Sequence, residues 1–519
     1  MKIVNCKLKI MKFFLKKYYP LLLILITASA LRINLLLVRG TFWFDEIFSF
    51  HFSQLPWAQA LKYWTIETNP PLHTLFIRGW IGLFHTQNEI LLRLPSVIFG
   101  LLAIIFLYLL AEKMFNRFTA SISALFLALS GIHIFTATEA RVYPLLTFLT
   151  ILSFYFFYSL YFLKENNKTK QWLYFVTNLL LIFSHLTALP IFLIQALILF
   201  LIKPEQKKIK QWWIAQLTIG AIWLVWFIPS IIAKIDPASL TAWYFDTSAK
   251  QFADIFTLLV SNFVNVNFSS FIFTLISIGI VTTIFSTISI ICKNPNQDEK
   301  NKLTFICLWG LLPIIFGSFL GVFITKYYVT ASLGIYLIVG SAIARITQTK
   351  KTKFLAIIIA IILMADTAIS IGTTPIFSWH YYLNYIKKQE TENSIIMVNP
   401  FNEELAIKHY YQGKTPVKGI YYKNDNLPFD ERVVRYNWNK QITSKEELKK
   451  WFDENLINKD TLFYFQYTEE YDWSHQILLA KGWQITKTLV YPGLINLYMF
   501  EFHAPNYTTT STLGTTKNK

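Results

Sequence analysis

Long apolar runs recur along this chain, and they decide what it can fold into. A helix needs roughly 20 residues to cross the hydrocarbon core of a bilayer. The chain has 519 residues, 54% of them hydrophobic, and eleven runs near that length, with a margin of about two. This pattern predicts a polytopic α-helical membrane protein. The expected spans are residues 18–38, 91–111, 118–137, 144–163, 172–188, 189–203, 212–232, 271–291, 303–323, 329–346 and 354–372.

The basic residues predict the orientation of these spans. The net charge is +18, and the surplus lies in residues 1–372, which hold 31 Lys and Arg against 14 Asp and Glu. Of those 31, 22 fall on the side of the N-terminus and 8 on the other side. Cytoplasmic loops carry such an excess, so we expect a cytoplasmic N-terminus and a first span retained as an anchor. A basic rim at the membrane accounts for the charge, and no nucleic-acid partner is expected.

Two long loops are expected on the outer side. The first, residues 39–90, contains the segments 56–64 and 72–84, which are too short or too polar to span and are predicted to lie in the interface. The second is residues 233–270, where 248–263 has helical apolar spacing.

After the last span the chain changes character. Alternating apolar residues predict strands, and the Ser444-x-x-Glu447 pattern predicts the start of a helix. We therefore expect a membrane domain at 1–372, an extracytoplasmic α/β domain at 373–505 and a disordered tail at 506–519. The expected strands are 394–398, 462–466, 484–491 and 494–502, and the expected helices are 403–411 and 444–455.

Polar residues that are hard to explain as scaffolding gather on the predicted outer side. A carboxylate can remove the proton of an attacking hydroxyl, and cations can stabilise a departing phosphate. No Walker or Gly-x-Gly-x-x-Gly pattern is present, so the expected donor is a lipid phosphate in place of a nucleotide. These residues are Asp45, Glu46, Glu67, His73, Arg93, Glu139, Arg141, His185 and Lys326.

Four motifs in this order resemble the C-type (GT-C) membrane glycosyltransferases, specifically the family 39 protein-mannosyltransferase group and its relative, the lipid A aminoarabinose transferase. The resemblance covers the membrane half, and an outer α/β domain is also common in that group. It implies an inverting enzyme that transfers a sugar from a polyprenyl-phosphate donor to a protein, lipid or polymer acceptor. The motifs are Trp43-x-Asp45-Glu46, Glu67-x-Asn69-Pro70-Pro71-x-His73, Arg93-x-Pro95-Ser96 and Glu139-x-Arg141-x-Tyr143.

The resemblance also implies roles for individual residues. Asp45 would be the catalytic base, and Glu46 would orient the acceptor or a metal. Lys326-Tyr327 stands where the family often has Arg-Tyr, and lysine lacks the bidentate fork of arginine. A divalent metal is an option at Glu67 with His73 or His185. The expected donor-phosphate residues are Arg93, Arg141, Lys326 and Tyr327, and the expected substrate-binding residues are Glu67, Asn69, His73, Glu139, Tyr143 and His185.

Plainer alternatives exist for several of these residues. The Asn69-Pro70-Pro71 segment could be only a rigid turn, and Arg93 could extend to the membrane interface. Glu139 and Arg141 could pair with each other and stabilise a turn, and His185 could be a polar turn residue.

Two other functions stay open. A transporter or flippase of lipid-linked sugars would place charges near the membrane midplane and carry internal repeats, whereas here the charges lie at one interface. A glycan receptor would need far fewer spans. The sequence predicts a multi-pass protein of the cell membrane and leaves the sugar and the acceptor undetermined.

Overall fold

The computed structural model forms two compact units. The membrane unit is the helical half up to residue 373 without Gly40–Phe48, and the C-terminal unit joins Gly40–Phe48 to the chain after residue 373. The described residues are 2–233, 270–293, 296–322, 324–347, 354, 358, 364–369, 377–420, 428–435, 444–469, 472–491 and 497–505.

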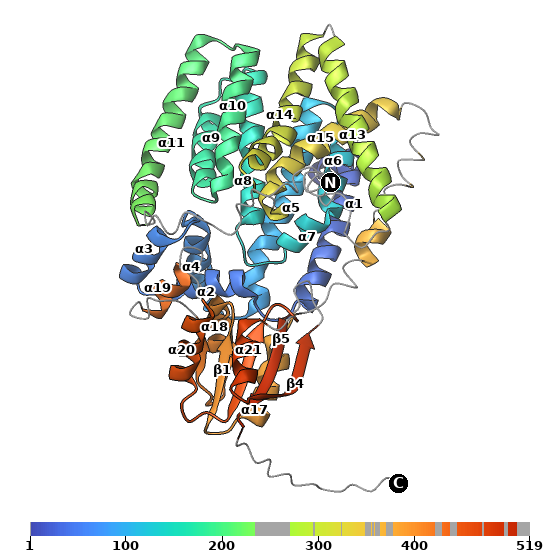
Figure 1. Cartoon of the computed structure of the whole chain (residues 1–519). Coiled ribbons are helices and arrows are strands. Elements are labelled where there is room, and N and C mark those ends of the chain that lie inside the picture. The colour runs from blue at the N-terminus through green and yellow to red at the C-terminus, as the bar shows by residue number, and fades with distance from the viewer. Residues whose placement is uncertain are drawn as a thin grey trace, which may run out of the picture. The chain divides into compact units, whose positions relative to one another are not determined.

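The membrane unit is α-helical, as predicted (Figure 1). Asparagine side chains cap several helices at their N-terminal ends, as Asn88 does for α5 and Asn116 for α6. The helices are α1 (Lys2–Val38), α2 (Phe44–Gln54), α3 (Trp57–Ile66), α4 (Leu72–Phe84), α5 (Glu89–Met114), α6 (Arg117–Leu129), α7 (Gly131–Thr136), α8 (Tyr143–Phe157), η1 (Tyr158–Phe162), α9 (Lys168–Ile182), η2 (Leu186–Ala188), α10 (Leu189–Ile202), α11 (Gln206–Ile232), α13 (Ser270–Lys293), α14 (Gln297–Phe319), η4 (Thr325–Tyr328) and α15 (Val329–Ile346).

Six helices among the described residues are long and apolar enough to cross a membrane. Other expected spans correspond to shorter helices: α6, α9 and α10 have 13, 15 and 14 residues. The expected span 354–372 and the interfacial segment 248–263 lie wholly or largely outside the described residues. A multi-span membrane protein is therefore supported, while the number eleven stays a prediction. The six are Lys17–Val38, Glu89–Met114, Tyr143–Phe162, Gln206–Ile232, Gln297–Phe319 and Thr325–Ile346.

The expected span 118–137 is broken in the middle, and the break explains a buried arginine. Helix α6 ends at Leu129, because Ser130 is extended and Gly131 follows it. The last carbonyl groups of a helix have no partner within it. Arg32 of α1, which is 1% exposed, donates from Nη1 to the oxygen of Ala128 at 3.0 Å and from Nη2 to that of Leu127 at 3.4 Å. The charge inside the first span thus binds the open end of α6.

Two glycines allow α14 and α15 to pack at very short range. A Cβ on Gly334 would lie 2.3 Å from the backbone nitrogen of Gly310, and a Cβ on Gly310 would lie 3.0 Å from the nitrogen of Ile335. Small residues at a helix crossing let the backbones approach. Helix α15 also packs on α6, and α5 packs between α6 and α8. These contacts form the core of the membrane unit.

The two segments of the first loop that were expected to lie in the interface are helical, while their placement in the interface stays a prediction. The segment 72–84 is α4, and 56–64 corresponds to α3. The backbone nitrogen of Leu72 donates to the oxygen of Phe183 at 3.1 Å, and Trp226 Nε1 of α11 donates to the oxygen of Trp64 at 3.0 Å. Helix α4 is therefore bound to the end of α9, and α3 is bound to the C-terminal part of α11.

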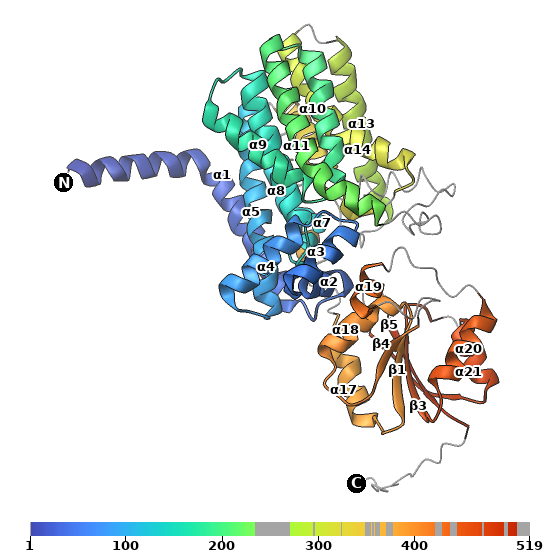
Figure 2. The same ribbon diagram turned by 90° about the vertical axis from the view of Figure 1, so that its left-hand side faces the viewer.

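The C-terminal unit is an α/β domain with one sheet of order β2-β1-β3-β5-β4. Strand β1 is parallel to β2 and β3, while β5 is antiparallel to β3 and β4. Figure 2 shows α17 and α18 on one side of this sheet and α20 and α21 on the other. The elements are α17 (Trp379–Gln389), β1 (Ser394–Val398), η5 (Phe401–Glu403), α18 (Glu404–Tyr410), β2 (Val417–Gly419), α19 (Phe429–Val434), α20 (Lys445–Asn455), β3 (Thr461–Gln466), α21 (Trp473–Ala480), β4 (Gln484–Tyr491) and β5 (Leu497–His503).

Most of these elements follow from local sequence. Strands β1 and β3 are buried along their whole length, since helices cover both sides of the sheet and the strands read as continuous apolar runs. Ser444 caps α20 by accepting from the nitrogen of Glu447 at 3.2 Å, as predicted. The three-residue strand β2 was not predicted. The expected strand 494–502 corresponds to β5 from Leu497 on, and its first three residues lie outside the described part of the chain.

The segment Gly40–Phe48 follows the first span, yet its contacts are with the C-terminal unit. Thr41 Oγ1 accepts from the nitrogen of Trp379 at 2.9 Å, and the nitrogen of Phe42 donates to Tyr410 Oη at 2.8 Å. No sequence pattern predicted this association. It means that the segment carrying Asp45 and Glu46 is held by α17 and α18.

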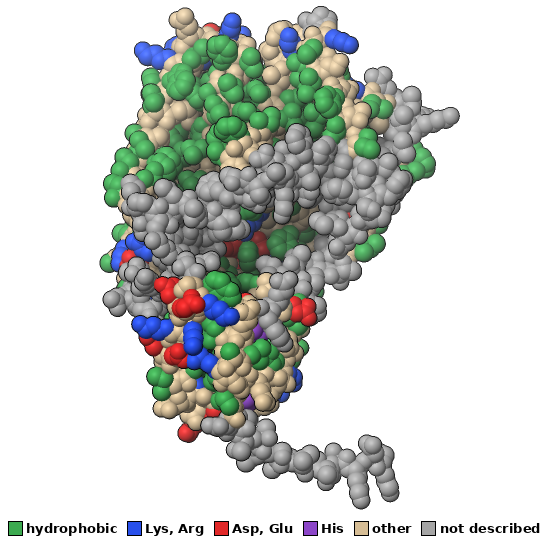
Figure 3. Space-filling model, viewed as in Figure 1, with side chains coloured by type: hydrophobic (Ala, Val, Ile, Leu, Met, Phe, Trp, Pro, Cys, Tyr) green, Lys and Arg blue, Asp and Glu red, His purple; other side chains and the backbone are tan. Residues whose placement is uncertain are grey.

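Charge and apolar surface are separated on the membrane unit. Figure 3 shows hydrophobic side chains covering the visible faces of the helices, with Lys and Arg gathered at the bundle end where α10 leads to α11. This distribution is that of helices in lipid with a basic rim at one membrane face.

Candidate functional site

Four predicted residues from distant segments meet in the membrane unit. The ring centroids of His185 and Tyr327 are 5.3 Å apart, and that of Tyr143 is 5.7 Å from His185 and 6.4 Å from Tyr327. The ammonium of Lys326 lies 5.6 Å from the centroid of the Tyr143 ring, within the range of a cation–π contact. We call Tyr143, His185, Lys326 and Tyr327 the aromatic–lysine cluster.

Local chain geometry places each member of the cluster. Pro144 occupies the start of α8 and fixes that helix to begin at Tyr143. His185 precedes η2, and its Nδ1 accepts from the nitrogen of Thr187 at 3.1 Å. Lys326 and Tyr327 lie in the single turn η4 before α15. His185 thus caps its turn, as the plainer alternative predicted, and also lies against the two tyrosines.

Arg141 adds a second cation near this cluster. Its Nη1 donates to Ser49 Oγ at 2.9 Å, which ties the Glu139-Ala-Arg141 turn to α2. Burial, and after it the charges of Arg141 and Lys326, lower the pKa of His185 to about 3. Burial, and after it the charge of Arg141, also lower the pKa of His73, at the start of α4, to about 3. His185 is therefore neutral at physiological pH, and the positive charge in this region comes from Arg141 and Lys326.

Glu139 has a partner that the sequence did not suggest. Its Oε1 lies 3.2 Å from Arg39 Nη2, and the carboxylate is 1% exposed. Arg39 also donates to Thr138 Oγ1 at 3.2 Å. The sequence suggested a pair of Glu139 with Arg141, which stays a prediction, and the structure adds Arg39 as a partner. An arginine directly after the first apolar run was the signal available in the sequence.

Glu67 and Asn69 form a turn of their own. Glu67 Oε1 accepts from Asn69 Nδ2 at 3.1 Å and from the Asn69 nitrogen at 3.3 Å. These bonds support the rigid-turn alternative for Asn69 and Pro70. Within the described part of the chain, no group of three or more His, Cys, Asp or Glu residues is placed to hold a metal ion. Among these residues, Glu67, His73 and His185 are therefore not part of a group that could bind a metal ion.

Arg93 is enclosed by the protein. It lies in the first turns of α5 and is 1% exposed, so its guanidinium does not extend to an aqueous interface. A buried charge of this kind is costly unless other groups compensate it. The donor-phosphate role of Arg93 stays a prediction.

Asp45 and Glu46 lie in the first turn of helix α2. The positive end of a helix dipole favours carboxylates in the first turn. Glu46 is fully buried, whereas Asp45 is partly exposed. Asp45 is therefore the member of the pair that can meet a ligand.

A third carboxylate, Glu403, was not singled out from the sequence. It ends η5, just after β1, is 2% exposed and accepts a hydrogen bond from the hydroxyl of Tyr467. Burial first, and then the negative charge of Asp45, raise the pKa of Glu403 to about 7. Ligands of open α/β sheets bind beyond the carboxyl ends of strands. The position of an Asn-Glu pair after a buried strand was the signal that could have pointed to it.

Comparisons with known proteins agree with this architecture. Residues 68–232 match the family model of dolichyl-phosphate-mannose-protein mannosyltransferases. ArnT from Cupriavidus metallidurans, in its apo state, has a TM-score of 0.56 at 13% identity and covers 92% of this chain and 97% of its own. The archaeal oligosaccharyltransferase AglB from Archaeoglobus fulgidus, solved with an inhibitory peptide and a dolichol-phosphate, has a TM-score of 0.54 at 12% identity over 87% of this chain and 70% of its own.

ArnT bound to undecaprenyl phosphate has a TM-score of 0.54 at 13% identity, with the same coverage as its apo form. No curated protein sequence matches the chain. At these identities the solved structures establish the fold. The resemblance predicted from the four motifs is confirmed at the level of the fold: the chain has the fold of the GT-C membrane glycosyltransferases, and its residues 68–232 match the mannosyltransferase family model.

Proposed function

We propose that the protein is an inverting glycosyltransferase, which moves a sugar from a polyprenyl-phosphate donor to an acceptor at the extracytoplasmic membrane face. The observation that carries the proposal is the aromatic–lysine cluster beside Arg141. Its members come from three segments of the chain, and together with Arg141 they combine two cations with aromatic rings. Cations bind a phosphate ester, and aromatic rings suit the apolar faces of a sugar.

Asp45 is the proposed base. Its carboxylate takes the proton of the acceptor hydroxyl or amine as that atom attacks the anomeric carbon from the face opposite the phosphate. The new glycosidic bond forms while the bond from the anomeric carbon to the phosphate oxygen breaks, and the configuration inverts. The bonding electrons leave with the lipid phosphate, and Lys326, Arg141 and Arg93 stabilise its charge.

One helix supports assigning Asp45 and Arg141 to the same reaction. Helix α2 contains both Asp45 and Ser49, about one turn apart, and Ser49 accepts the hydrogen bond of Arg141. Glu46 orients the acceptor in this scheme, and Glu67, His73 and Glu139 contribute to binding. No step requires a metal ion.

The test is transfer of a radiolabelled sugar by the purified full-length protein from a panel of polyprenyl-phosphate sugars. We expect turnover by the wild type and none by Asp45→Asn. Asp453→Asn, an exposed aspartate of α20, is the matched control and should retain activity. Equal turnover by Asp45→Asn and wild type would remove Asp45 as the base. Donor movement across the membrane without transfer would favour the transporter, and loss of activity with a chelator would call for a metal.

A further inference from the structure

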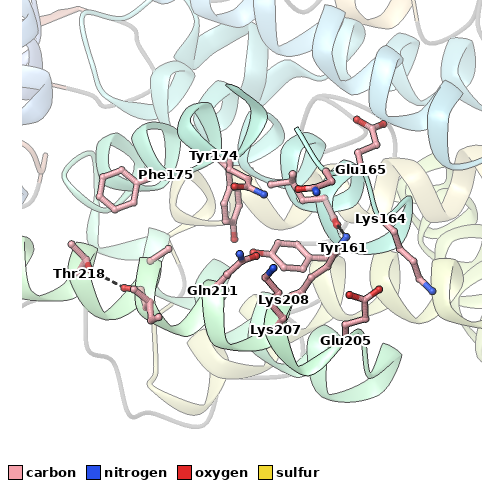
Figure 4. A pocket seen from close by; sticks show the side chains of 15 residues that line it. Tyr161, Lys164, Glu165, Tyr174, Phe175, Glu205, Lys207, Lys208, Gln211 and Thr218 are labelled. Carbon is pink, nitrogen blue, oxygen red and sulfur yellow. Dashed lines mark hydrogen bonds between the residues drawn. The ribbon is translucent and has the colours of Figure 1, made fainter. Parts of the chain in front are cut away.

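A pocket lies at the bundle end opposite the proposed reaction, at the face that the charge pattern predicts to be cytoplasmic. Its volume is about 550 Å³, and it is bounded by the start of α9, the start of α11 and the turn after η1. Figure 4 shows Lys164, Glu165 and Glu205 at one end of the pocket and Phe175 and Thr218 at the other. One end is therefore charged, and the other is largely apolar.

The charged end has an excess of lysines. Lys164, Lys207 and Lys208 line it together with two carboxylates, Glu165 and Glu205. Glu165 is already neutralised, because Lys113 lies 3.2 Å from its Oε1 and Lys170 pairs with its Oε2. Glu205 is left opposite three ammonium groups, so the pocket attracts an anion.

The lysines differ in what they bind within the protein. Lys208 Nζ donates to the oxygen of Leu160 at 2.9 Å, a carbonyl of the π-helix η1. Single π-helical turns leave backbone groups outside the regular α-helical pattern and often mark functional positions. The ammonium groups of Lys164 and Lys207 make no hydrogen bond or ion pair with any other residue that the structure describes. Their ammonium groups are the ones available to a ligand.

The polarity of the pocket changes along α11. Lys207, Gln211 and Ala215 recur at intervals of four and so share one face of the helix, with Ile214 and Thr218 beside them further along. The face runs from a cation through an amide to apolar side chains in the direction of the membrane interior. A ligand that follows it has an anionic head and an apolar tail.

We propose that this pocket binds the phosphate head group of a membrane lipid, held by Lys164 and Lys207, with its hydrocarbon chain along Phe175 and Ile214. Basic pockets between spanning helices at the cytoplasmic face suit such head groups. The same chemistry is presented by an anionic phospholipid and by a polyprenyl phosphate. The site is separate from the aromatic–lysine cluster, since the two sets share no residue, and it does not depend on the transfer reaction.

The test is native mass spectrometry of the full-length protein in detergent, titrated separately with phosphatidylglycerol, undecaprenyl phosphate, phosphatidylcholine and inorganic phosphate. The test variant is Lys164→Gln/Lys207→Gln. Lys387→Gln/Lys388→Gln removes two exposed lysines of α17 and is the matched control. Ala215→Trp fills the apolar part and keeps every lysine.

We expect an anionic lipid to bind and phosphatidylcholine to bind weakly. The double pocket variant should lose about fivefold in affinity per lysine, roughly 25-fold together, while the control should match the wild type. Ala215→Trp should also weaken binding, and whichever lipid responds to both changes identifies the source. Equal lipid binding by wild type and the double pocket variant would overturn the proposal. So would binding of inorganic phosphate that responds to the lysines without any lipid response.

Discussion

Arg39 Nη2 lies 3.2 Å from Glu139 Oε1, which joins the end of the first span to the turn that carries Arg141. The Arg39 side chain is 13% exposed and that of Glu139 is 1% exposed. A buried ion pair contributes little beyond apolar packing, yet removing one partner leaves an uncompensated charge.

Arg39→Gln should therefore destabilise the membrane unit by about 3–5 kcal/mol, because the Glu139 carboxylate stays buried and loses the charge of Arg39. Thermal unfolding in detergent measures the change. The double variant Arg39→Gln/Glu139→Gln should recover part of the loss, since no charge is then stranded. Arg117→Gln, which breaks an exposed pair with Glu112, should cost at most about 1 kcal/mol. Equal costs for the two single variants would show that burial of the pair is unimportant.

Lys326→Gln should weaken binding of the donor phosphate. Hydrogen bonds to charged groups contribute about 1.5–3 kcal/mol, so the KM for donor should rise roughly 10- to 150-fold. Lys326→Arg should keep the donor KM within a few-fold of wild type, because it restores the charge and adds a planar fork over Tyr143. Steady-state kinetics with varied donor measures both. An unchanged KM in Lys326→Gln would place the phosphate elsewhere.

Sequence patterns predicted the parts of this protein that depend on local physics. The apolar helices of the membrane unit, the helix at 72–84 and the cap at Ser444 all follow from periodicity or from a single capping side chain. The resemblance to a known family implied that Tyr143 and Lys326 belong to one site, and the two residues lie close together. The binding of Gly40–Phe48 by α17 and α18 did not, because tertiary contacts between residues more than 300 positions apart leave no local pattern.

Two further features that were not predicted also depend on contacts between residues far apart in the sequence. The break at Ser130 was hidden by apolar residues on both sides, and its compensation by Arg32 involves side chain to backbone contacts across 96 positions. Glu403 looked like an ordinary helix residue, since its environment is made by Tyr467 and Asp45 from remote segments.

Glu403→Gln should change the pH dependence of stability. Burial and the nearby Asp45 raise the pKa of Glu403 from 4.5 to about 7, so the folded state holds its proton more tightly than the unfolded state. The resulting stability is fully present below about pH 4.5 and is lost as the pH rises to about 7, an effect of about 3 kcal/mol. The variant lacks this titration, so its unfolding midpoint relative to wild type should rise between pH 5 and 8.

Thermal unfolding of the full-length protein at pH 5, 6, 7 and 8 provides the comparison. Glu446→Gln removes an exposed carboxylate of α20 and serves as the control for a changed net charge. A constant difference between wild type and Glu403→Gln at all four pH values would contradict a raised pKa at this position.

Gly334→Val should prevent the membrane unit from folding. A Cβ at this position would lie 2.3 Å from the nitrogen and 2.7 Å from the Cα of Gly310, and backbone atoms cannot rotate away as a flexible side chain can. Overpacking typically costs about 1–3 kcal/mol even where side chains adjust, so separation of α14 from α15 should cost more than that.

Gly79→Ala in α4 is the matched control, because no atom lies within 4 Å of its added Cβ and alanine favours a helix by about 1 kcal/mol. The yield of monodisperse protein on size-exclusion chromatography distinguishes the two: we expect it to collapse for Gly334→Val and to equal or exceed wild type for Gly79→Ala. Normal yield and unfolding temperature for Gly334→Val would show that α14 and α15 do not meet at these glycines.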